Sequence, residues 1–242
     1  MNKQKELARL WDGERREMLK QQYATPEEHA NRFKRLVRYL KVDGLLLNAA
    51  VGTGTPALVG LDAAKDDRKL LLSDGDAAFL QLLRANYPGW QARQAFWQGL
   101  PAVFGKKALG AVEISGNSMP YASGWNGSSG DIREKTEALE ESLAAVFAVL
   151  EKCGKFVFDI ARYGQGRHEI GKGYFLMLDY RGGLRYWTVG NGKTSKTRTG
   201  LILDIGAISG ILRKIGFAQP KQVPPQLQLD PLYYELYFAE KK

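Results

Sequence analysis

Apolar residues follow two patterns along this chain: short continuous runs, and spacings of three and four between charged residues. The runs LLLNAA (45–50), KLLLSD (69–74), ALGAVEISG (108–116) and KFVFDIARY (155–163) predict strands buried on both faces. QARQAFW (91–97) predicts a further, shorter strand. Helical spacing fills the segments between them. This alternation of strand and helix predicts an α/β fold with a doubly wound, mostly parallel sheet built from right-handed crossovers.

Start and stop signals mark several of the helices. TPEE (25–28) supplies an N-cap threonine, a proline for the first turn and the glutamate of a capping box. The apolar spacing of SLAAVFAVLEKCG and ISGILRKIGF predicts two more helices, which we expect to end at Gly154 and Gly216.

The pattern changes after the fifth strand. GYFLMLDYRGGLRYWTVGNGKTSKTRTGLILD (173–204) is typical of strands and hairpins, with glycines at the turns. We therefore expect four parts: an N-terminal helical lid that includes an amphipathic helix over Lys3 to Gln22, an α/β core, a β-rich insertion that shapes a substrate pocket, and a C-terminal helix with the last strands of the core. Their boundaries are 1–44, 45–163, 164–204 and 205–242.

Composition narrows the class of protein. The 242 residues hold 35 Lys and Arg against 26 Asp and Glu, a net charge of +9 that allows an anionic partner without requiring one. The single cysteine cannot form an internal disulfide, so we expect a reducing, cytoplasmic location. Two histidines argue against a histidine-rich metal site and a hydrolase triad, and we expect no metal. No apolar run approaches the ~20 residues that span a bilayer, so no membrane partner is expected.

The first strand and the turn after it, LLLNAAVGTGTPAL (45–58), carry the candidate binding site. Open parallel sheets bind ligands at the carboxyl ends of their strands, and Gly52 and Gly54 allow a ligand to approach the backbone there. Asp74 ends the second strand about 20 residues further on, where a carboxylate accepts hydrogen bonds from a ribose. The alternative is a tight turn in which Asp74 or Asp76 only caps the next helix. Ala57 replaces the third glycine of a dinucleotide motif, which is weak evidence against a dinucleotide.

These residues resemble the cofactor-binding motif of class I S-adenosylmethionine-dependent methyltransferases, and more narrowly L-D-x-A-C-G-T-G-x of the glycine/sarcosine N-methyltransferase branch. Three further stretches resemble motifs of that branch in the same order: SDGDAAFLQLL, AVEISGNSMPY and LEKCGKFVFDIARY. The G-N-S element, Gly116 to Ser118, is the most specific of them. The resemblance covers nearly the whole chain from Tyr23. It implies a seven-stranded Rossmann-like sheet and S-adenosyl-L-methionine as the cofactor.

The resemblance also implies roles for single residues. Asp74 would hold the ribose hydroxyls, Trp97 would flank the adenine, and Asn117 would lie beside the reactive methyl group. The full implied set comprises Tyr23, Ala50, Gly52, Gly54, Asp74, Gly75, Trp97 and Ser115 for the cofactor, and Asn117, Tyr121, Arg162 and Tyr163 for catalysis.

The sequence departs from the branch at several of its motif positions. Asn48 stands where the branch has an aspartate, and Tyr121 stands where it has a histidine. Arg162 lies one position after the arginine that would clamp an amino-acid carboxylate, and one position along a strand reverses the face. These departures count against glycine or sarcosine as the substrate.

An activated sulfonium methyl asks its enzyme mainly for positioning, which can remove ~7–11 kcal/mol of barrier. We expect a small-molecule N-methyltransferase in which Asn117 and Tyr121 orient an amine. Glu113, in the middle of a strand, is a weaker candidate than either. Aromatic residues of the insertion, Trp187 among them, would flank the amine by cation–π contact or pack between strands.

Two other functions stay open. The positive charge favours an RNA or protein methyltransferase, but the chain lacks an N-P-P-[YF] base-methylation motif. Asn48 and the shifted Arg162 favour a non-catalytic protein of the same fold that binds the cofactor or a partner. We expect a small-molecule acceptor as the partner, favour nucleic acid less, and leave a homo-oligomer open.

Overall fold

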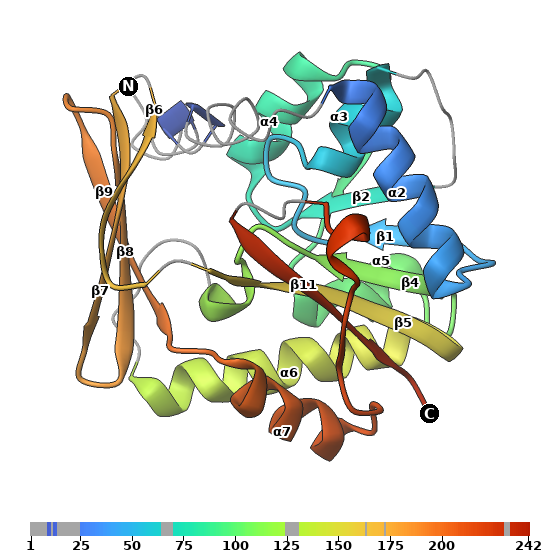
Figure 1. Cartoon of the computed structure of the whole chain (residues 1–242). Helices are drawn as coiled ribbons and strands as arrows, with labels where there is room; N and C mark the ends of the chain where they lie inside the picture. Colours follow the sequence, from blue (N-terminus) through green and yellow to red (C-terminus); the bar gives the residue numbers. More distant parts are fainter. Residues whose placement is uncertain are drawn as a thin grey trace.

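The computed structural model of the chain describes residues 9–10, 12–13, 25–63, 70–123, 131–162, 164–171, 173–229 and 233–242. The described chain forms an α/β core and, at one end of it, a separate antiparallel sheet (Figure 1). Most of the amphipathic helix expected between Lys3 and Gln22 lies outside the described residues.

The core is built on a seven-stranded sheet with the order β10-β11-β5-β4-β1-β2-β3. The pairs β3–β2, β2–β1, β1–β4 and β4–β5 are parallel, whereas β11 runs antiparallel to β5 and β10. The predicted fold class, a doubly wound and mostly parallel seven-stranded sheet with a β-rich insertion, is confirmed. The strands are β1 (Leu46–Asn48), β2 (Leu70–Asp74), β3 (Ala92–Gln94), β4 (Leu109–Ile114), β5 (Leu150–Ala161), β10 (Lys221–Gln222) and β11 (Tyr234–Glu240).

Helices cover both faces of this sheet, which is why its central strands are apolar on both sides (Figure 1). One hydrophobic cluster joins the sheet to α2, α3 and α4, and a second joins it to α5, α6 and α7. Leu46 belongs to the first cluster and Leu47 to the second, as alternation along a strand requires. The helices are α2 (Pro26–Leu40), α3 (Pro56–Ala63), α4 (Ala77–Asn86), α5 (Leu100–Phe104), α6 (Ile132–Val149) and α7 (Ile205–Ile215), with short 3-10 helices η1 (Trp97–Gly99), η2 (Met119–Tyr121) and η3 (Pro225–Leu227).

The predicted capping box at the start of α2 is confirmed. The backbone N–H of Glu28 donates to Thr25 Oγ1 at 3.2 Å, and the N–H of Thr25 donates to Glu28 Oε2 at 2.7 Å. α2 then packs closely on α3, and the missing side chain of Gly60 allows this, since a Cβ there would collide with the backbone of Ala30. Within the segment predicted as a lid, α2 is therefore a helix of the core layer.

The predicted end of α6 at Gly154 is wrong. The helix ends at Val149, and Leu150 is already extended and pairs with Leu109 as the first residue of β5. Backbone hydrogen bonds from Cys153 to Lys241 and from Lys241 to Gly154 hold the next residues against the C-terminus. Pairing with distant strands thus overrides the local helical spacing. The end of α7 at Gly216 is confirmed.

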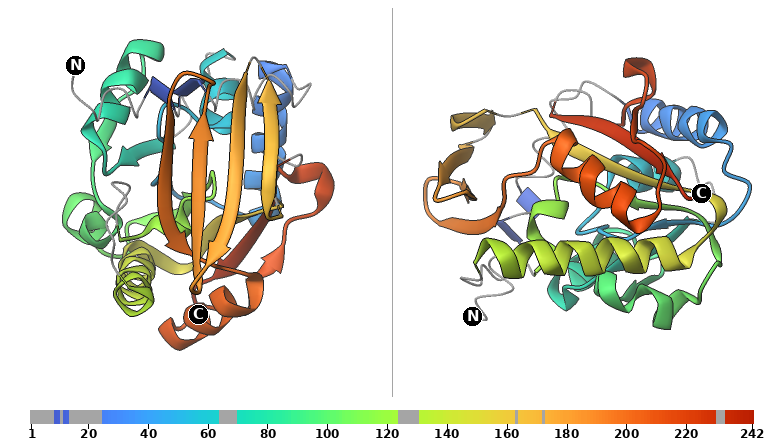
Figure 2. Two further views of the ribbon diagram at one scale, coloured as in Figure 1. Left: turned by 90° about the vertical axis from the view of Figure 1, so that its left-hand side faces the viewer. Right: turned by 90° about the horizontal axis from the view of Figure 1, so that it is seen from below.

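The insertion forms an antiparallel sheet of order β6-β7-β8-β9. Two views show it as a curved layer that stands across the end of the seven-stranded sheet (Figure 2). The predicted hairpins are present as β7 (Tyr174–Arg181), β8 (Leu184–Gly190) and β9 (Ser195–Leu201), and β6 (Gly166–Gly171) adds an edge strand before them. Because β5 leads directly into β6, the sheet faces the carboxyl ends of the parallel strands.

Candidate active site

A cavity lies between the carboxyl ends of the parallel strands and the sheet of the insertion. Its empty volume is about 670 Å³ including the open mouth, within the range that small-molecule sites occupy. It is lined by the turn after β1, by the end of β2, by the loop after β4, and by single residues of α4, β8 and β11. The lining residues are Ala50, Val51, Gly52, Thr53, Gly54, Thr55, Asp74, Phe79, Ser115, Gly116, Asn117, Ser118, Tyr121, Trp187 and Tyr234.

The turn after β1 leaves space at the cavity wall. Gly52 has a φ of +54°, which side chains rarely tolerate, and a Cβ added there would meet no atom within 4 Å. The turn therefore presents bare backbone to the cavity, and any side chain at Gly52 would extend into the free volume.

Asp74 lies at the floor of the same region and is 4% exposed. Its Oδ2 accepts the N–H of Gly52 at 2.9 Å and its Oδ1 accepts the N–H of Asp76 at 2.9 Å. Burial raises the pKa of Asp74 to about 6, while those two hydrogen bonds and the charge of Arg198 oppose the rise. Asp76, not Asp74, caps α4, because its Oδ1 accepts the N–H of Ala78. This leaves Asp74 facing the cavity.

Two adjacent aromatic residues after β3 take different places. Trp97 is 9% exposed and packs in the core, where its Nε1–H donates to the carbonyl of Ala49 at 2.7 Å. Phe96 is 64% exposed, and a Cβ at Gly75 would lie 2.6 Å from its ring. Thus Trp97 supports the turn after β1 from within the core through this hydrogen bond, whereas Phe96 lies against Gly75.

The G-N-S loop after β4 is held by a carboxylate from β5. Gly116 and Asn117 both have positive φ, +74° and +55°, and a left-handed asparagine costs roughly 1–2 kcal/mol. Asp159 compensates: its oxygens accept the N–H of Gly116 at 2.6 Å and that of Asn117 at 2.8 Å. Charged acceptors make such hydrogen bonds strong. The conformation of this loop therefore depends on a residue 42 positions away.

The side chain of Asn117 reaches from this loop to the insertion. Its Oδ1 accepts a hydrogen bond from Arg185 Nη1 at 2.9 Å, and the Arg185 guanidinium stacks 4.6 Å from the ring centroid of Trp187. Gly200 is paired with Arg185 across β8 and β9. A Cβ at Gly200 would lie 2.7 Å from the carbonyl oxygen of Pro120, so the absence of a side chain there lets η2 contact the insertion.

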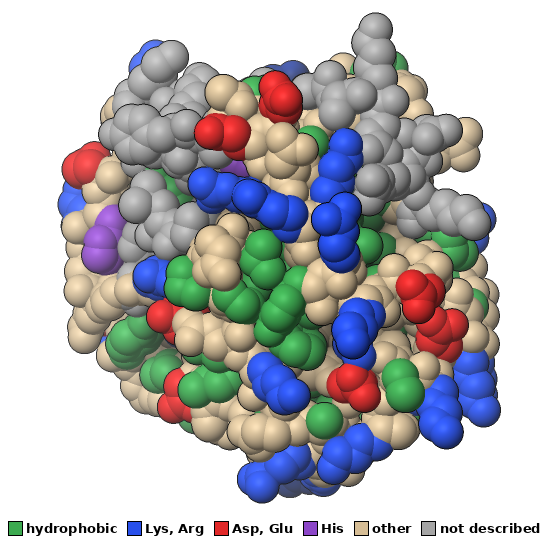
Figure 3. Space-filling view, turned by 45° about the vertical axis from the view of Figure 1, so that its right-hand side comes forward, with side chains coloured by type: hydrophobic (Ala, Val, Ile, Leu, Met, Phe, Trp, Pro, Cys, Tyr) green, Lys and Arg blue, Asp and Glu red, His purple; other side chains and the backbone are tan. Residues whose placement is uncertain are grey.

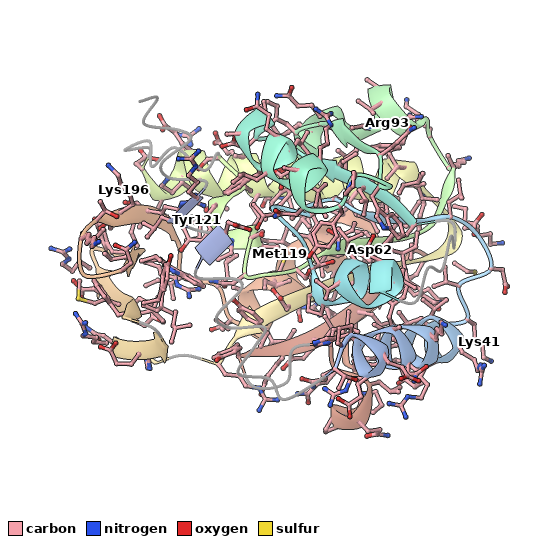
Figure 4. The ribbon with its side chains drawn as sticks, turned by 90° about the horizontal axis from the view of Figure 1, so that it is seen from above. Lys41, Asp62, Arg93, Met119, Tyr121 and Lys196 are labelled. Carbon is pink, nitrogen blue, oxygen red and sulfur yellow. The ribbon has the colours of Figure 1, made fainter. Side chains whose placement is uncertain are left out.

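Tyr121 lies at the junction of the two sheets. It is 3% exposed, and its ring meets the Trp187 ring edge-on with centroids 6.3 Å apart. Figure 4 shows it between the insertion, which carries Lys196, and the α/β core. Tyr121, Trp187 and Asn117 thus form one continuous wall of the cavity.

Only some of the other residues implied by the resemblance line the cavity. Ala50, Gly54 and Ser115 line the cavity, whereas Gly75 and Trp97 are absent from its lining. Arg162 does not line it either: its Nε donates to the carbonyl of Tyr234 at 3.2 Å and its Nη2 to Gln228 Oε1 at 3.4 Å. Tyr23 and Tyr163 lie outside the described residues.

A buried carboxylate lies beside the position where the branch carries its aspartate. Asn48 Nδ2 donates to Glu113 Oε2 at 3.2 Å, and the two residues are paired across β1 and β4. The N–H of Ala50 in turn donates to Asn48 Oδ1 at 3.3 Å. Glu113 is 2% exposed on a central strand, so it is not an edge-facing residue.

Sequence reasoning missed Asp159, Arg185, Phe79 and Tyr234 as site residues. Asp159 stood inside a recognised motif, and its position at the end of a strand was a usable signal. Arg185 lies two residues before Trp187, so strand alternation places both on one face. Nothing local indicated that this face points toward the cavity.

Over the parts of the chain that the structure describes, no group of three or more His, Cys, Asp and Glu side chains could hold a metal ion. Among those same residues, no helix is long and apolar enough to cross a membrane.

No protein-family model and no curated protein matches the sequence. Solved structures do match the fold. An S-adenosylmethionine-dependent methyltransferase from Clostridium acetobutylicum ATCC 824 is 12% identical, with a TM-score of 0.64 over 92% of this chain and 94% of that one. CalS10, an amino pentose methyltransferase from Micromonospora echinaspora, is 16% identical, with a TM-score of 0.62 over 96% of both chains. The sugar N-methyltransferase KedS8 from Streptoalloteichus sp ATCC 53650 is 17% identical, with a TM-score of 0.60 over 90% and 89%. These matches show that the chain has the class I methyltransferase fold.

Proposed function

We propose that this protein is an S-adenosylmethionine-dependent methyltransferase that methylates the nitrogen of a small amine. The observation that carries the proposal is Asp74, a buried carboxylate at the carboxyl end of β2, facing a cavity beside the bare backbone of Gly52. The fold is that of class I methyltransferases, and the solved structures of similar fold include an amino pentose methyltransferase and a sugar N-methyltransferase.

The residues present fit the cofactor. Each oxygen of Asp74 accepts one backbone N–H and keeps a lone pair for a ribose hydroxyl. A pKa of about 6 leaves the carboxylate ionised at neutral pH. The open space above Gly52 admits the chain that joins the ribose to the sulfonium.

Two neighbouring regions complete the cofactor half of the site. Glu113, bonded to Asn48, places a buried carboxyl group beside the position where the branch has its aspartate on β1, and we assign it to the methionine ammonium. Beside Gly75, the exposed ring of Phe96 flanks the adenine, while Trp97 holds the turn in place through Ala49.

When bound, the cofactor supplies an electrophilic methyl group, so the protein needs only to hold a neutral amine in line with it. Ser115 Oγ lines the cavity and, as placed, is buried with no hydrogen-bond partner, which makes it an acceptor for an amine N–H. Tyr121 and Trp187 exclude water from the same wall. Such fixed orientation is worth ~7–11 kcal/mol of barrier.

The cavity favours a small acceptor over RNA or protein, because the sheet of the insertion covers it with Trp187. One face of the molecule also lacks the charge pattern of a nucleic-acid site. On the face that Figure 3 shows, Lys and Arg side chains are interspersed with acidic and apolar ones instead of forming a continuous basic patch. Electrostatic binding of a nucleic acid needs basic residues gathered on one face.

The test is calorimetry with S-adenosylhomocysteine. Asp74→Ala removes the acceptor of two hydroxyl donors, each worth ~1.5–3 kcal/mol to a charged group, so affinity should fall by about a hundredfold or more. Asp76→Ala is the matched control: it removes a carboxylate from the same loop but should lower only the melting temperature, since Asp76 caps α4. Unchanged affinity in Asp74→Ala would end the proposal.

Catalysis needs a second measurement, because a non-catalytic protein of this fold would also bind the nucleoside. Release of S-adenosylhomocysteine should be measured across a panel of amines, amino sugars and amino acids. Tight binding of the cofactor with no release from any acceptor would favour the non-catalytic alternative.

A further inference from the structure

Arg185 is an unusual arginine for the inner face of a sheet. It is 5% exposed, and its Nη1 is used by Asn117. Its Nε and Nη2 are buried and have no hydrogen-bond partner, and no acidic side chain pairs with it anywhere in the described ranges. Buried charges are costly unless they are paired, so an arginine left with two free donors is expected to have a partner that the chain does not supply.

The two free donors lie on one edge of the guanidinium. Nε–H and an Nη2 N–H point in parallel, which is the fork that binds two oxygens of a carboxylate or phosphate at once. The bond from Nη1 to Asn117 and the stacking on Trp187 fix the plane of the group before any ligand arrives. The side chain is therefore preorganised for an oxyanion.

Arg185 is not itself among the residues that line the cavity, but it lies directly against two that are. Asn117 and Trp187, the two residues that hold the guanidinium, both line the cavity. The residue paired with Arg185 on β9 is Gly200, and Pro120 and Tyr121 of η2 occupy the space where its side chain would lie. Asp159, a carboxylate bonded to this loop, already accepts the N–H groups of Gly116 and Asn117.

A second arginine adds positive potential. Arg198 is paired with Trp187 across β8 and β9, so it lies on the same face, and it is 2% exposed. Its charge is felt in the cavity, where it works to lower the pKa of Asp74. Two nearby cations also disfavour an ammonium, so a bound amine would be held in its neutral, nucleophilic form.

We infer that the methyl acceptor carries an oxyanion, a carboxylate or a phosphate, in addition to its amine, and that the Nε and Nη2 edge of Arg185 binds it. The inference rests on the proposed function. The insertion then selects the acceptor, and the arginine that binds the oxyanion lies on β8, at a position far from Arg162.

The test follows the Arg185 Nε–H signal by nuclear magnetic resonance in the full chain saturated with S-adenosylhomocysteine. Absence of the signal in Arg185→Lys assigns it. Acetate and inorganic phosphate are titrated separately against chloride at equal ionic strength. A saturable shift with either oxyanion supports the inference and identifies the class. A signal that moves no more than it does in chloride overturns it.

Variants add a second readout through the Trp187 indole signal. Arg185→Lys keeps the charge but loses the fork, so oxyanion affinity should fall by about tenfold or more while the affinity for S-adenosylhomocysteine stays the same. Arg181→Lys is the matched control, because Arg181 stacks on Tyr186 in the same sheet but is exposed and paired with Asp179. Equal oxyanion affinity in Arg185→Lys and the parent would also overturn the inference.

The two proposals fail in different ways. If S-adenosylhomocysteine does not bind, the proposed function fails, and the oxyanion titration is still read in the unsaturated protein. If it binds and the Arg185 signal does not respond to either oxyanion, only the acceptor inference fails.

Discussion

The two halves of the cavity are built by different means. On the cofactor side, the turn after β1 and Asp74 at the end of the adjacent strand β2 are joined by a hydrogen bond between residues 22 positions apart. On the acceptor side, Asn117 depends on Asp159 and Arg185, which are 42 and 68 positions away in β5 and in the insertion. The first half belongs to the core of the fold. The second forms only when the insertion docks against η2.

This difference means that the halves should respond separately to mutation. A change in the turn after β1 should alter cofactor binding and leave oxyanion binding at Arg185 unchanged. A change in the support of the G-N-S loop should do the reverse. Three experiments test this separation.

The largest effect is expected from Asp159→Ala. The variant leaves two buried N–H groups without acceptors and a left-handed Asn117 without support, so unfolding free energy should fall by about 3 kcal/mol or more. Chemical denaturation measures this. Oxyanion binding at Arg185 should be lost, while affinity for S-adenosylhomocysteine should change by less than about threefold. Asp159→Asn, which keeps one acceptor oxygen, should be intermediate. An equal loss of both ligands would contradict the separation.

A smaller, opposite effect is expected from Gly52→Ala. The new Cβ would enter the cavity from a backbone with φ of +54°, and crowding of this kind costs ~1–3 kcal/mol. Affinity for S-adenosylhomocysteine should fall by about tenfold or more in calorimetry, with oxyanion binding unchanged. Gly99→Ala is the control, since Gly99 also has open space around it but a negative φ. If Gly52→Ala binds S-adenosylhomocysteine as tightly as the parent, the turn after β1 is not part of the cofactor site.

The smallest effect is the pH dependence of cofactor binding. The pKa of Asp74 is raised from 3.8 to about 6, chiefly by burial, and hydroxyl donors prefer its ionised form. Affinity for S-adenosylhomocysteine should therefore fall as the pH drops through 6, by about tenfold between pH 7 and pH 5. Oxyanion binding to Arg185 should not follow this curve. Asp74→Asn should flatten it, and a curve that persists in that variant would assign the titration to another group.

The same pKa shift affects the stability of the free protein. The folded state holds the Asp74 proton more tightly than the unfolded chain does, so this group's contribution to stability falls as the pH rises from about 4 to about 6. Binding of the nucleoside should release that proton near pH 6, which calorimetry in buffers of different ionisation enthalpy would detect.

Several features were predictable because their signals are local. The capping box of α2, the glycine turn after β1 and Asp74 at the end of β2 each rest on neighbouring residues or on the known geometry of parallel strands. The G-N-S loop was recognised by its motif, and its conformation follows from the tolerance of Gly116 and Asn117 for positive φ.

Other features depended on distant pairing. α6 was predicted to run to Gly154, but pairing of Leu150 with Leu109 ends it earlier. Phe96 and Trp97 are adjacent aromatic residues, and only the packing of the core decides which one is buried. The arginine expected near the acceptor was Arg162, whereas the arginine bonded to Asn117 of the cavity wall comes from β8.

The parallel sheet, the bare turn and the carboxylate beside it follow from local sequence patterns, because apolar periodicity, glycine and strand ends act over short stretches of chain. Long-range packing selects the face of the insertion that covers the cavity and the arginine that bonds to Asn117. That choice depends on the register of β7, β8 and β9 and on the contact between Gly200 and η2. Such contacts join residues far apart in the chain, and no local pattern encodes their partners.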